Sequence, residues 1–239
     1  MRVLIVMLWR KLPREFRDRF HYFLHIINSN SLVLRAISFR HNRTVNLFSN
    51  SSKDLRIRLG ESRFYEGWIS TNYQLFCRHF LDATKPYGMC VAQYIFADNV
   101  IEHLNRSDGE RLIRQAFSAL VPGGVLRLAT PDLQQIVNRY QDKNTSDLQD
   151  FAESVLGHGL EIRDFPDLLR VTFVEFGHHK GYIYDYEALS SVLENCGFER
   201  IRKVRPGESS ISELVNLESR TGNSDMWSQM VIEATKPWN

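Results

Sequence analysis

The sequence predicts an α/β protein built around a mostly parallel, doubly wound sheet with an antiparallel strand at its C-terminal end. Two observations support this fold class. From Asp54 onward, short apolar runs typical of strands alternate with segments in which apolar residues recur at helical spacing. The last two strand candidates, 198–204 and 226–234, have only a loop between them, so we expect them to pair antiparallel. Apolar residues make up 43% of the 239-residue chain and charged residues 24%, which is typical of a globular domain.

The other strand candidates are short apolar or alternating runs that end at glycine, proline or a polar residue. They cover residues 55–59, 67–71, 94–97 and 125–130, and one further strand is expected to end near Asp82. The run at 94–97 is apolar and aromatic, as a strand buried on both faces is.

Two helices of the predicted domain carry start and stop signals. Ser107 is followed three residues later by Glu110, which is the pattern of a capping box, and Pro122 should break the helix that follows. Asp185 is expected to cap a later helix, and Gly197 is expected to end it. In both segments the apolar residues fall on one side, so each helix should pack on the sheet.

The N-terminal part of the chain differs from the rest in charge. Residues 1–50 hold nine Lys and Arg against two acidic residues, whereas the remainder holds 21 basic and 26 acidic residues. The polar run at 49–53 is the expected boundary between a basic helical extension over 1–50 and a main domain over 51–239. Residues 10–27 form a predicted amphipathic helix, which either packs on the main domain or lies on an anionic membrane surface.

Composition also argues against several classes of protein. A net charge of +2 argues against a general nucleic-acid binder, and no apolar run approaches the roughly 20 residues that span a bilayer. Three cysteines without a Cys-x-x-Cys pair argue against a disulfide scaffold or a zinc ribbon and favour a reducing compartment. The apolar start MRVLIVMLW precedes the basic residues, the reverse of a secretory signal. We therefore expect a cytoplasmic protein, with peripheral membrane contact through residues 10–27 as an open alternative.

Polar residues and glycine follow the predicted strands at their carboxyl ends, where ligands bind in sheets of this kind. These residues are Gly60, Asn72, Asp82, Asp98 and Asn99. An adenosine-like ligand needs partners for its ribose hydroxyls, which Asn72 offers, and for its adenine amino group, which Asp82 offers. Each residue taken alone is also typical of a turn or a cap. Their occurrence at successive strand ends favours a ligand site.

Several motifs resemble a known family. Residues 96–104 read FADNVIEHL, and residues 120–132 read LVPGGVLRLATPD after the intervening helix. Further matching segments are GWISTN at 67–72, LDATKP at 81–86, the pair Gly177 and His178, and the segment 184–198. The sequence from about 54 to 236 resembles class I S-adenosylmethionine-dependent methyltransferases, most of all the "methyltransferase type 11"-like branch associated with surface-polysaccharide biosynthesis. The N-terminal extension lies outside this resemblance.

The resemblance implies a seven-strand Rossmann-like fold with S-adenosylmethionine bound over the end of the first strand. The implied cofactor-binding residues are Gly60, Glu61 and Ser62 at the methionine moiety, Asn72 at the ribose, Asp82 near the adenine, and Asp98 and Asn99 below the pocket. The implied activity is transfer of a methyl group to an oxygen or nitrogen of a small or glycan-related acceptor.

Two departures from the family pattern keep a second hypothesis open. The usual Gly-x-Gly is Gly60-Glu61-Ser62 here, and Asn72 stands where the family carries an acidic residue. The alternative is a catalytically silent methyltransferase-like domain that acts as a scaffold or partner in a glycan-assembly complex. A pocket filled by Glu61, Ser62 or Phe64 would favour that alternative, whereas an open cleft would favour the enzyme. A nicotinamide dehydrogenase is disfavoured, because no Gly-x-Gly-x-x-Gly follows the first strand.

Histidine suits the removal of a proton from an acceptor at neutral pH. The predicted catalytic residues are His103, which follows a strand that borders the pocket, and His178 and His179, which lie in a loop bounded by glycines. The alternative for His103 is a packing or capping role. No metal site is predicted, because histidines at helical ligand spacing are lacking. A ligand set could form only through the fold, from His158, Asp164, Glu175, His178 and His179. The expected partners are a small-molecule or glycan acceptor and no nucleic acid, and the oligomeric state is left open.

Overall fold

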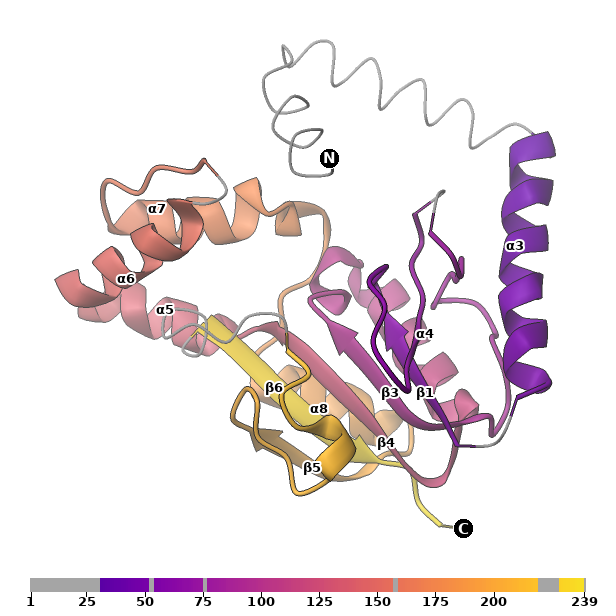
Figure 1. Cartoon of the computed structure of the whole chain (residues 1–239). Coiled ribbons are helices and arrows are strands. Elements are labelled where there is room, and N and C mark those ends of the chain that lie inside the picture. The colour runs from indigo at the N-terminus through magenta and orange to yellow at the C-terminus, as the bar shows by residue number, and fades with distance from the viewer. Residues whose placement is uncertain (1–30, 52–53, 75–76, 157–158, 219–227, 239) are drawn as a thin grey trace.

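The computed structural model describes residues 31–51, 54–74, 77–156, 159–218 and 228–238 (Figure 1). At its centre lies a six-stranded sheet with the strand order β2-β1-β3-β4-β6-β5. The strands are β1 (Leu55–Leu59), β2 (Ile69–Ser70), β3 (Ala92–Asp98), β4 (Leu120–Pro131), β5 (Glu199–Val204) and β6 (Gln229–Thr235). The predicted α/β class with a mostly parallel sheet is confirmed.

The directions of the strands determine which strand ends share an edge of the sheet. β2, β1, β3 and β4 run parallel, and β6 runs antiparallel to both of its neighbours, β4 and β5, as predicted for the last two strands. The carboxyl ends of the parallel strands therefore share one edge of the sheet. β6 enters the same edge with its first residue, because Gln229 pairs with Pro131 at the end of β4.

The seventh expected strand, ending near Asp82, does not form in the described part of the chain. The segment between β2 and β3 makes only an isolated parallel bridge between Asn72 and Phe80. Two backbone hydrogen bonds hold it, from Asn72 N to His79 O and from Leu81 N to Asn72 O, both 3.1 Å long. The seven-strand prediction is thus corrected to six for the described residues.

Helix α4 (Arg106–Ala119) begins earlier than its sequence signal suggests. Its N-cap is Asn105, whose Oδ1 accepts a 3.0 Å hydrogen bond from Asp108 N, so the expected capping role of Ser107 is corrected. Asn is as strong an N-cap as Ser. β4 starts directly after the helix, so Pro122 lies within a strand, where a register shift against β3 absorbs the irregularity.

Two other helices begin at aspartate caps. α8 (Tyr186–Asn195) starts after Asp185, whose carboxylate accepts a 2.8 Å hydrogen bond from the backbone of the first turn, as predicted. Gly197 follows this helix with a φ of +95°, which confirms it as the terminating residue. α5 (Leu133–Asp142) starts after Asp132, whose carboxylate also accepts hydrogen bonds from the first turn.

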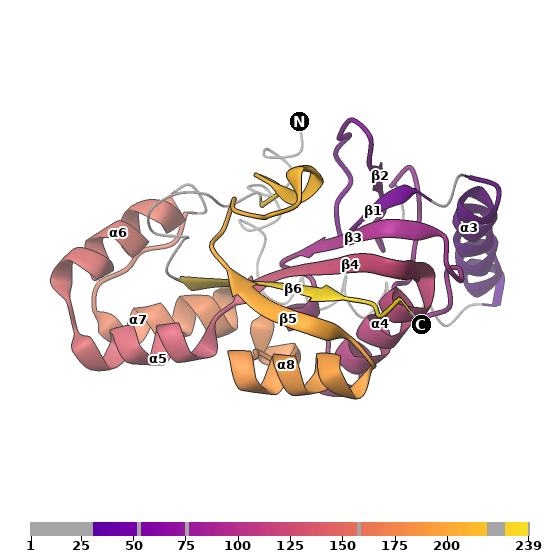
Figure 2. The ribbon, with the colours of Figure 1, turned by 90° about the horizontal axis from the view of Figure 1, so that it is seen from below.

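The two faces of the sheet are covered differently (Figure 2). α4 and α8 pack on one face and bury the main core, which includes Leu112 and Leu189. The segment 205–217, with the short helix η4 (Ser212–Leu214), crosses the other face. A doubly wound sheet predicts helices on both faces. Among the described residues, this second face carries the 205–217 segment and its single short helical turn.

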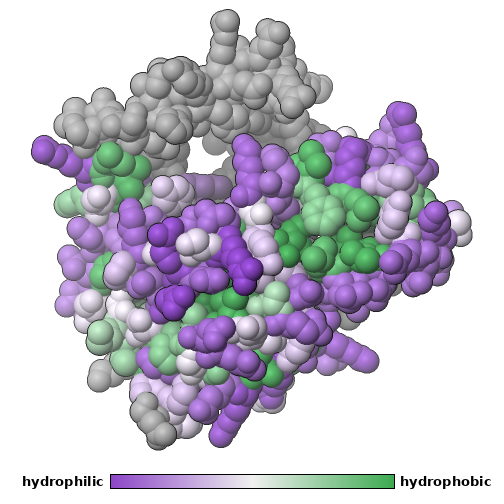
Figure 3. Space-filling model, turned by 180° about the vertical axis from the view of Figure 1, so that it is seen from behind, coloured by the Kyte–Doolittle hydropathy of each residue, from purple (hydrophilic) through white to green (hydrophobic). Residues whose placement is uncertain are grey.

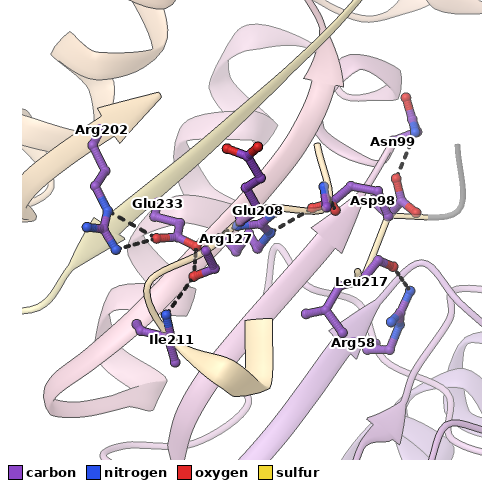
Figure 4. A network of polar contacts seen from close by, with 12 residues as sticks. Arg58, Asp98, Asn99, Arg127, Arg202, Glu208, Ile211, Leu217 and Glu233 are labelled. Atoms are coloured by element: carbon purple, nitrogen blue, oxygen red, sulfur yellow. Dashed lines mark hydrogen bonds and ion pairs between the residues drawn. The ribbon is translucent and has the colours of Figure 1, made fainter. Parts of the chain in front are cut away.

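A buried charged network lies beneath the 205–217 segment (Figure 4). Arg127 of β4 donates through Nε to Glu218 Oε1 at 2.7 Å and through Nη1 to the backbone oxygen of Glu208 at 3.1 Å. It also pairs with the carboxylate of Glu233 on β6. Arg202 of β5 donates to the same carboxylate at 2.7 Å. The network therefore ties the segment to three neighbouring strands.

Helix α3 (Ser31–Ser49) joins the C-terminal part of the predicted extension to the main domain (Figure 1). Phe48 is fully buried in the main core and packs edge-on against Tyr87, with ring centroids 6.5 Å apart. The amphipathic helix expected over 10–27 lies outside the described residues, so its packing and its membrane contact stay predictions. None of the helices that the structure describes combines the length and the apolarity that crossing a bilayer requires.

A helical projection extends from the end of β4. α5, α6 (Thr145–Leu156) and α7 (Phe165–Arg170) share a separate apolar cluster that includes Phe151 and Leu168. Figure 1 shows the projection beyond the sheet, and Figure 3 shows hydrophobic residues gathered at the surface on this side of the molecule. The projection stands over the same sheet edge as the strand-end residues, so it can wall a second cavity there.

Candidate functional site

An open cleft of about 590 Å³ lies at the carboxyl edge of the sheet, a volume typical of small-molecule sites. Five predicted residues line this large cleft: Gly60, Asn72, Asp82, Asn99 and His103. They come from the ends of β1, β2 and β3 and from the loop between β2 and β3. The fold therefore brings together residues that the sequence placed at successive strand ends.

Gly60 allows the backbone to form the floor of the large cleft. Its φ of +76° lies in the left-handed region, and a Cβ atom there would lie 2.3 Å from Cγ2 of Val100. Val100 also lines the cleft. A side chain at position 60 would thus strain the backbone and displace the cleft wall.

Asn72 closes the end of β1 against the following loop. Its Nδ2 donates a 2.8 Å hydrogen bond to Gly60 O, and its Oδ1 accepts a 3.0 Å hydrogen bond from Gln74 N. A side-chain amide carries two donor hydrogens and two acceptor lone pairs. Asn72 therefore keeps one donor and one acceptor for a ligand.

Asp82 is fixed in the cleft wall by its own turn and by helix α3. Its Oδ1 accepts hydrogen bonds from Thr84 N (3.1 Å) and Thr84 Oγ1 (2.7 Å), and its Oδ2 lies 3.2 Å from Lys85 Nζ. Burial raises the pKa of Asp82, but the contacts with Thr84 and Lys85 outweigh burial and lower it. The backbone N–H of Asp82 donates to Nδ1 of the buried His41 at 3.3 Å. The carboxylate is therefore charged at neutral pH and held in place.

Glu61 and Ser62, predicted at the cofactor's methionine moiety, are not among the residues that line the cleft. The Glu61 carboxylate accepts hydrogen bonds from the backbone N–H groups of Ser62 and Arg63 (2.7 and 2.8 Å) and from the Arg63 side chain. Burial raises the pKa of Glu61, but the bonds from Arg63 and Ser62 outweigh it and lower the pKa to about 2. The Glu61 carboxylate is thus bound within its own turn. Phe64 is 80% exposed and also leaves the cleft open.

Asp98 is likewise not among the lining residues, although it was predicted beside Asn99. Its Oδ1 accepts a 2.8 Å hydrogen bond from Asn99 Nδ2. Asn99 follows the last residue of β3 and adopts a φ of +52°, so the regular alternation of strand side chains ends at Asp98. Asp98 orients Asn99, and Asn99 alone of the pair lines the cleft.

A second, small cavity of about 100 Å³ lies beside the large cleft, and Asn99 lines both. Its apolar wall, which includes Phe151 and Phe176, comes from the helical projection and the segment after α7. Gln229 also lines it and is only 6% exposed, yet neither Oε1 nor Nε2 of its amide has a hydrogen-bond partner. An unsatisfied buried amide is costly, so a polar group that entered this cavity would gain hydrogen bonds from Gln229.

Two of the three predicted histidines meet at the junction of the cavities. His103, in the 3₁₀ turn η1 (Ile101–His103), lines the large cleft, and His178, in the 3₁₀ turn η3 (His178–Lys180), lines the small cavity. Their ring centroids are 4.8 Å apart. His179 is exposed and lines neither of these cavities, so the structure separates it from the pair.

A close backbone approach holds the two turns together. A Cβ atom on Gly181 would lie 1.8 Å from the backbone oxygen of Glu102, so only glycine fits there. The Gly181 N–H donates a 2.9 Å hydrogen bond to His178 O. The Glu102 side chain is fully buried, and its Oε2 accepts a 3.2 Å hydrogen bond from Thr130 Oγ1. Ligand atoms of Glu102, His103 and His178 lie within 4.8 Å of one another.

The charges at the site favour a ligand without phosphate groups. The residues described around the large cleft include the carboxylates of Asp82 and Asp108 and no Lys or Arg. Asp108 also occupies the first turn of α4, where a phosphate would otherwise find free N–H groups. Lys85 pairs with Asp82 and Arg111 pairs with Asp108, so these carboxylates carry little uncompensated charge, and the lining offers no basic side chain to a pyrophosphate.

Some residues at the site were not predicted from the sequence. They reach it through the pairing of the last strand or belong to the helical projection and the segment after it. Gln229 had a usable signal: an antiparallel final strand must start at the edge where the parallel strands end, so its first residue belongs to the site. Phe151 and Phe176 had no such signal, because nothing in the sequence says where the projection folds back. Asp108 was hidden as an ordinary residue of a first helical turn.

No protein-family model matches this sequence, and no curated protein matches it either. Solved structures do resemble the fold at low identity. One is described as an S-adenosylmethionine-dependent methyltransferase, possible histamine N-methyltransferase, from Thermotoga maritima: it is 17% identical, the match covers 92% of this chain and 97% of that chain, and the TM-score is 0.46.

A methyltransferase of the same cofactor dependence from Archaeoglobus fulgidus is 13% identical, with 91% and 99% of the two chains covered and a TM-score of 0.44. The CurJ carbon methyltransferase is 12% identical with a TM-score of 0.45; the match covers 89% of this chain and spans 57% of that longer chain. At this level of similarity, the function has to be argued from the geometry of the site itself.

Proposed function

We propose that this chain is an S-adenosylmethionine-dependent methyltransferase that acts on an oxygen or nitrogen of a small or glycan-related acceptor. One observation carries the proposal: two cavities of unequal size meet at Asn99, with His103 lining one and His178 lining the other. A transferase needs this arrangement, because donor and acceptor must meet end to end. Asn99 adopts a φ of +52°, and such strain is often found at functional sites.

The large cleft suits an adenosine cofactor with a cationic sulfonium better than it suits a dinucleotide. Gly60 brings backbone to the cleft floor, Asn72 offers one free donor and one free acceptor, and Asp82 holds a charged carboxylate in the wall. No glycine-rich phosphate loop follows β1, and the described lining carries no basic side chain. These features support S-adenosylmethionine as the cofactor.

The small cavity suits the reacting end of an acceptor. Its volume of about 100 Å³ holds a small group rather than a whole glycan. Phe151 and Phe176 offer apolar surface, and the amide of Gln229 offers one donor side and one acceptor side. A sugar presents this combination of an apolar ring face and hydroxyl groups, which supports a glycan-related acceptor.

Bound S-adenosylmethionine supplies a methyl group on a strongly electrophilic sulfonium, so little covalent chemistry is left to the protein. The chain has to align the acceptor and take up its proton. His178 borders the acceptor cavity and His103 borders the cofactor cleft, so either imidazole is placed to accept a proton at the junction. Asn99 separates the two cavities and can orient the acceptor through its side-chain amide.

The silent-scaffold alternative predicts a cleft filled by Glu61, Ser62 or Phe64. Instead, the cleft is open and none of these three residues lines it. The glycan-assembly setting of either hypothesis is a proposal that rests on the sequence resemblance.

Cofactor binding is the direct test of the proposal. Calorimetric titration of the full chain with S-adenosylhomocysteine should show one-to-one binding. Gly60→Ala should weaken it at least tenfold, because the new methyl group displaces Val100 from the cleft wall. Gly159→Ala is the matched control: its φ of +70° brings similar backbone strain, but no atom lies within 4 Å of the new methyl group. Absence of binding at millimolar ligand would overturn the proposal.

Gln229→Leu should raise stability while impairing function. Leucine removes an unsatisfied buried amide, so the free energy of unfolding should rise by about 1 kcal/mol or more in urea titrations. Binding of S-adenosylhomocysteine should be unchanged, because Gln229 does not line the large cleft. Gln134→Leu on the exposed side of α5 is the control and should change stability little. A destabilised Gln229→Leu chain would show that the amide has a structural partner instead.

A further inference from the structure

We propose that Glu102, His103 and His178 form a binding site for a divalent first-row transition-metal ion. The three side chains come from two turns that are distant in sequence, and their ligand atoms lie within 4.8 Å of one another. Two imidazole nitrogens and one carboxylate oxygen make a donor set that zinc and non-haem iron sites in proteins share. The sequence predicted no metal here, because none of these residues has a helical ligand spacing with the others.

The distances allow an ion after a modest side-chain adjustment. Ligands at about 2.0–2.1 Å from a tetrahedral ion lie about 3.3 Å from one another. Since no pair of ligand atoms is more than 4.8 Å apart, the closing movement is at most about 1.5 Å for any pair, and the exposed His103 ring has room to rotate. Glu102 and His178 are both buried, so the two less mobile ligands already sit in a shielded position.

Neighbouring groups hold the ligand side chains in place, as hydrogen-bonded neighbours hold the ligands in known metal sites. Thr130 Oγ1 donates to Oε2 of Glu102 at 3.2 Å, which fixes the carboxylate. The close packing of Gly181 on the Glu102 backbone fixes His178 against the turn that carries the other two ligands. The backbone around the site is therefore arranged before any ion arrives.

Three protein ligands leave coordination positions for other molecules, as in catalytic rather than structural metal sites. His103 borders the large cleft and His178 the small cavity, so the open positions face the junction. What the ion does there rests on the proposed function: with both imidazoles held as ligands, the ion instead of a histidine would ease loss of the proton from an acceptor hydroxyl. Binding of the ion itself is independent of that function.

The test is titration of the full-length, metal-free chain with Zn²⁺ and, for a spectroscopic signal, with Co²⁺. We expect one ion per chain and visible absorption bands from bound Co²⁺. His178→Gln and Glu102→Gln should each weaken binding at least tenfold. His103→Gln should do the same, and its exposed position makes loss of folding an inadequate explanation. His179→Gln is the matched control, because its side chain is exposed and outside the cluster; it should bind within twofold of the unaltered chain.

Equal affinity of the His178→Gln and His179→Gln chains, or no saturable one-to-one binding of either ion, would overturn the proposal. Titration of the metal-free chain with S-adenosylhomocysteine, performed separately, shows whether the methyltransferase proposal holds. A chain that binds S-adenosylhomocysteine and no metal would refute the ion site alone. A chain that binds the metal and no S-adenosylhomocysteine would refute the proposed function alone.

Discussion

Replacing Arg127 with methionine should lower the free energy of unfolding by about 3–5 kcal/mol, because the change leaves two buried carboxylates without their shared cation. The side chains of Arg127 and Glu218 are both 0% exposed and lie 2.7 Å apart, and the Glu233 side chain is 2% exposed. Burying a charge without a partner costs far more than an ordinary core substitution. Chemical unfolding followed by circular dichroism measures the loss.

The control for this substitution is Arg205→Met, which changes an exposed arginine just after β5 and should alter stability by less than about 0.5 kcal/mol. A chain in which Arg127, Glu218 and Glu233 are all replaced by methionine or leucine should recover much of the loss, because no buried charge then remains unpaired. If Arg127→Met alone cost less than about 1 kcal/mol, the carboxylates would have to be neutral or hydrated in the folded chain.

Gly181→Ala should disrupt the site through the backbone. The added methyl group would lie 1.8 Å from the Glu102 carbonyl oxygen, so the turn that carries His178 must move away from the turn that carries His103. A displacement of about 1 Å at a reacting centre can reduce turnover about a hundredfold. We expect such a loss of methyl transfer, with S-adenosylhomocysteine affinity little changed because Gly181 does not line the large cleft.

Nuclear magnetic resonance gives a readout that does not require the acceptor. The imidazole rings of His103 and His178, with centroids 4.8 Å apart, should show proton–proton contacts that Gly181→Ala abolishes. Gly177→Ala is the control, because its φ of +83° makes alanine strained while no atom lies within 4 Å of the new methyl group. Retained ring contacts in Gly181→Ala would mean that the two turns tolerate the methyl group by moving together.

The sequence was a good guide where local patterns determine structure. The alternation in β1, the cap at Asp185 and the stop at Gly197 were all readable, because each depends on residues close in the chain. The strand that was expected to end near Asp82 does not form, because its pairing with the sheet is limited to the Asn72–Phe80 bridge. A residue pattern shows that a segment can adopt an extended conformation. Tertiary contacts decide whether that segment pairs with a neighbouring strand.

The site was predictable to the extent that it depends on strand ends. Gly60, Asn72, Asp82 and Asn99 line one cleft because the carboxyl ends of parallel strands share one edge of the sheet. Glu61 does not line the cleft, because its own turn captures the carboxylate, and the sequence does not show this capture. The meeting of His103 with His178 depends on a contact between residues far apart in the chain, which no local spacing encodes.

The two edge strands of the sheet have a further consequence for contact between molecules. β2 contributes only two residues to its ladder, and β5 carries Glu199, Arg200, Arg202 and Lys203, with an irregular register between Glu199 and Arg202. Short, charged or irregular edges resist the addition of a strand from another chain. Neither edge of the described sheet therefore favours aggregation by strand addition, so we expect the folded chain to resist fibril formation at high concentration.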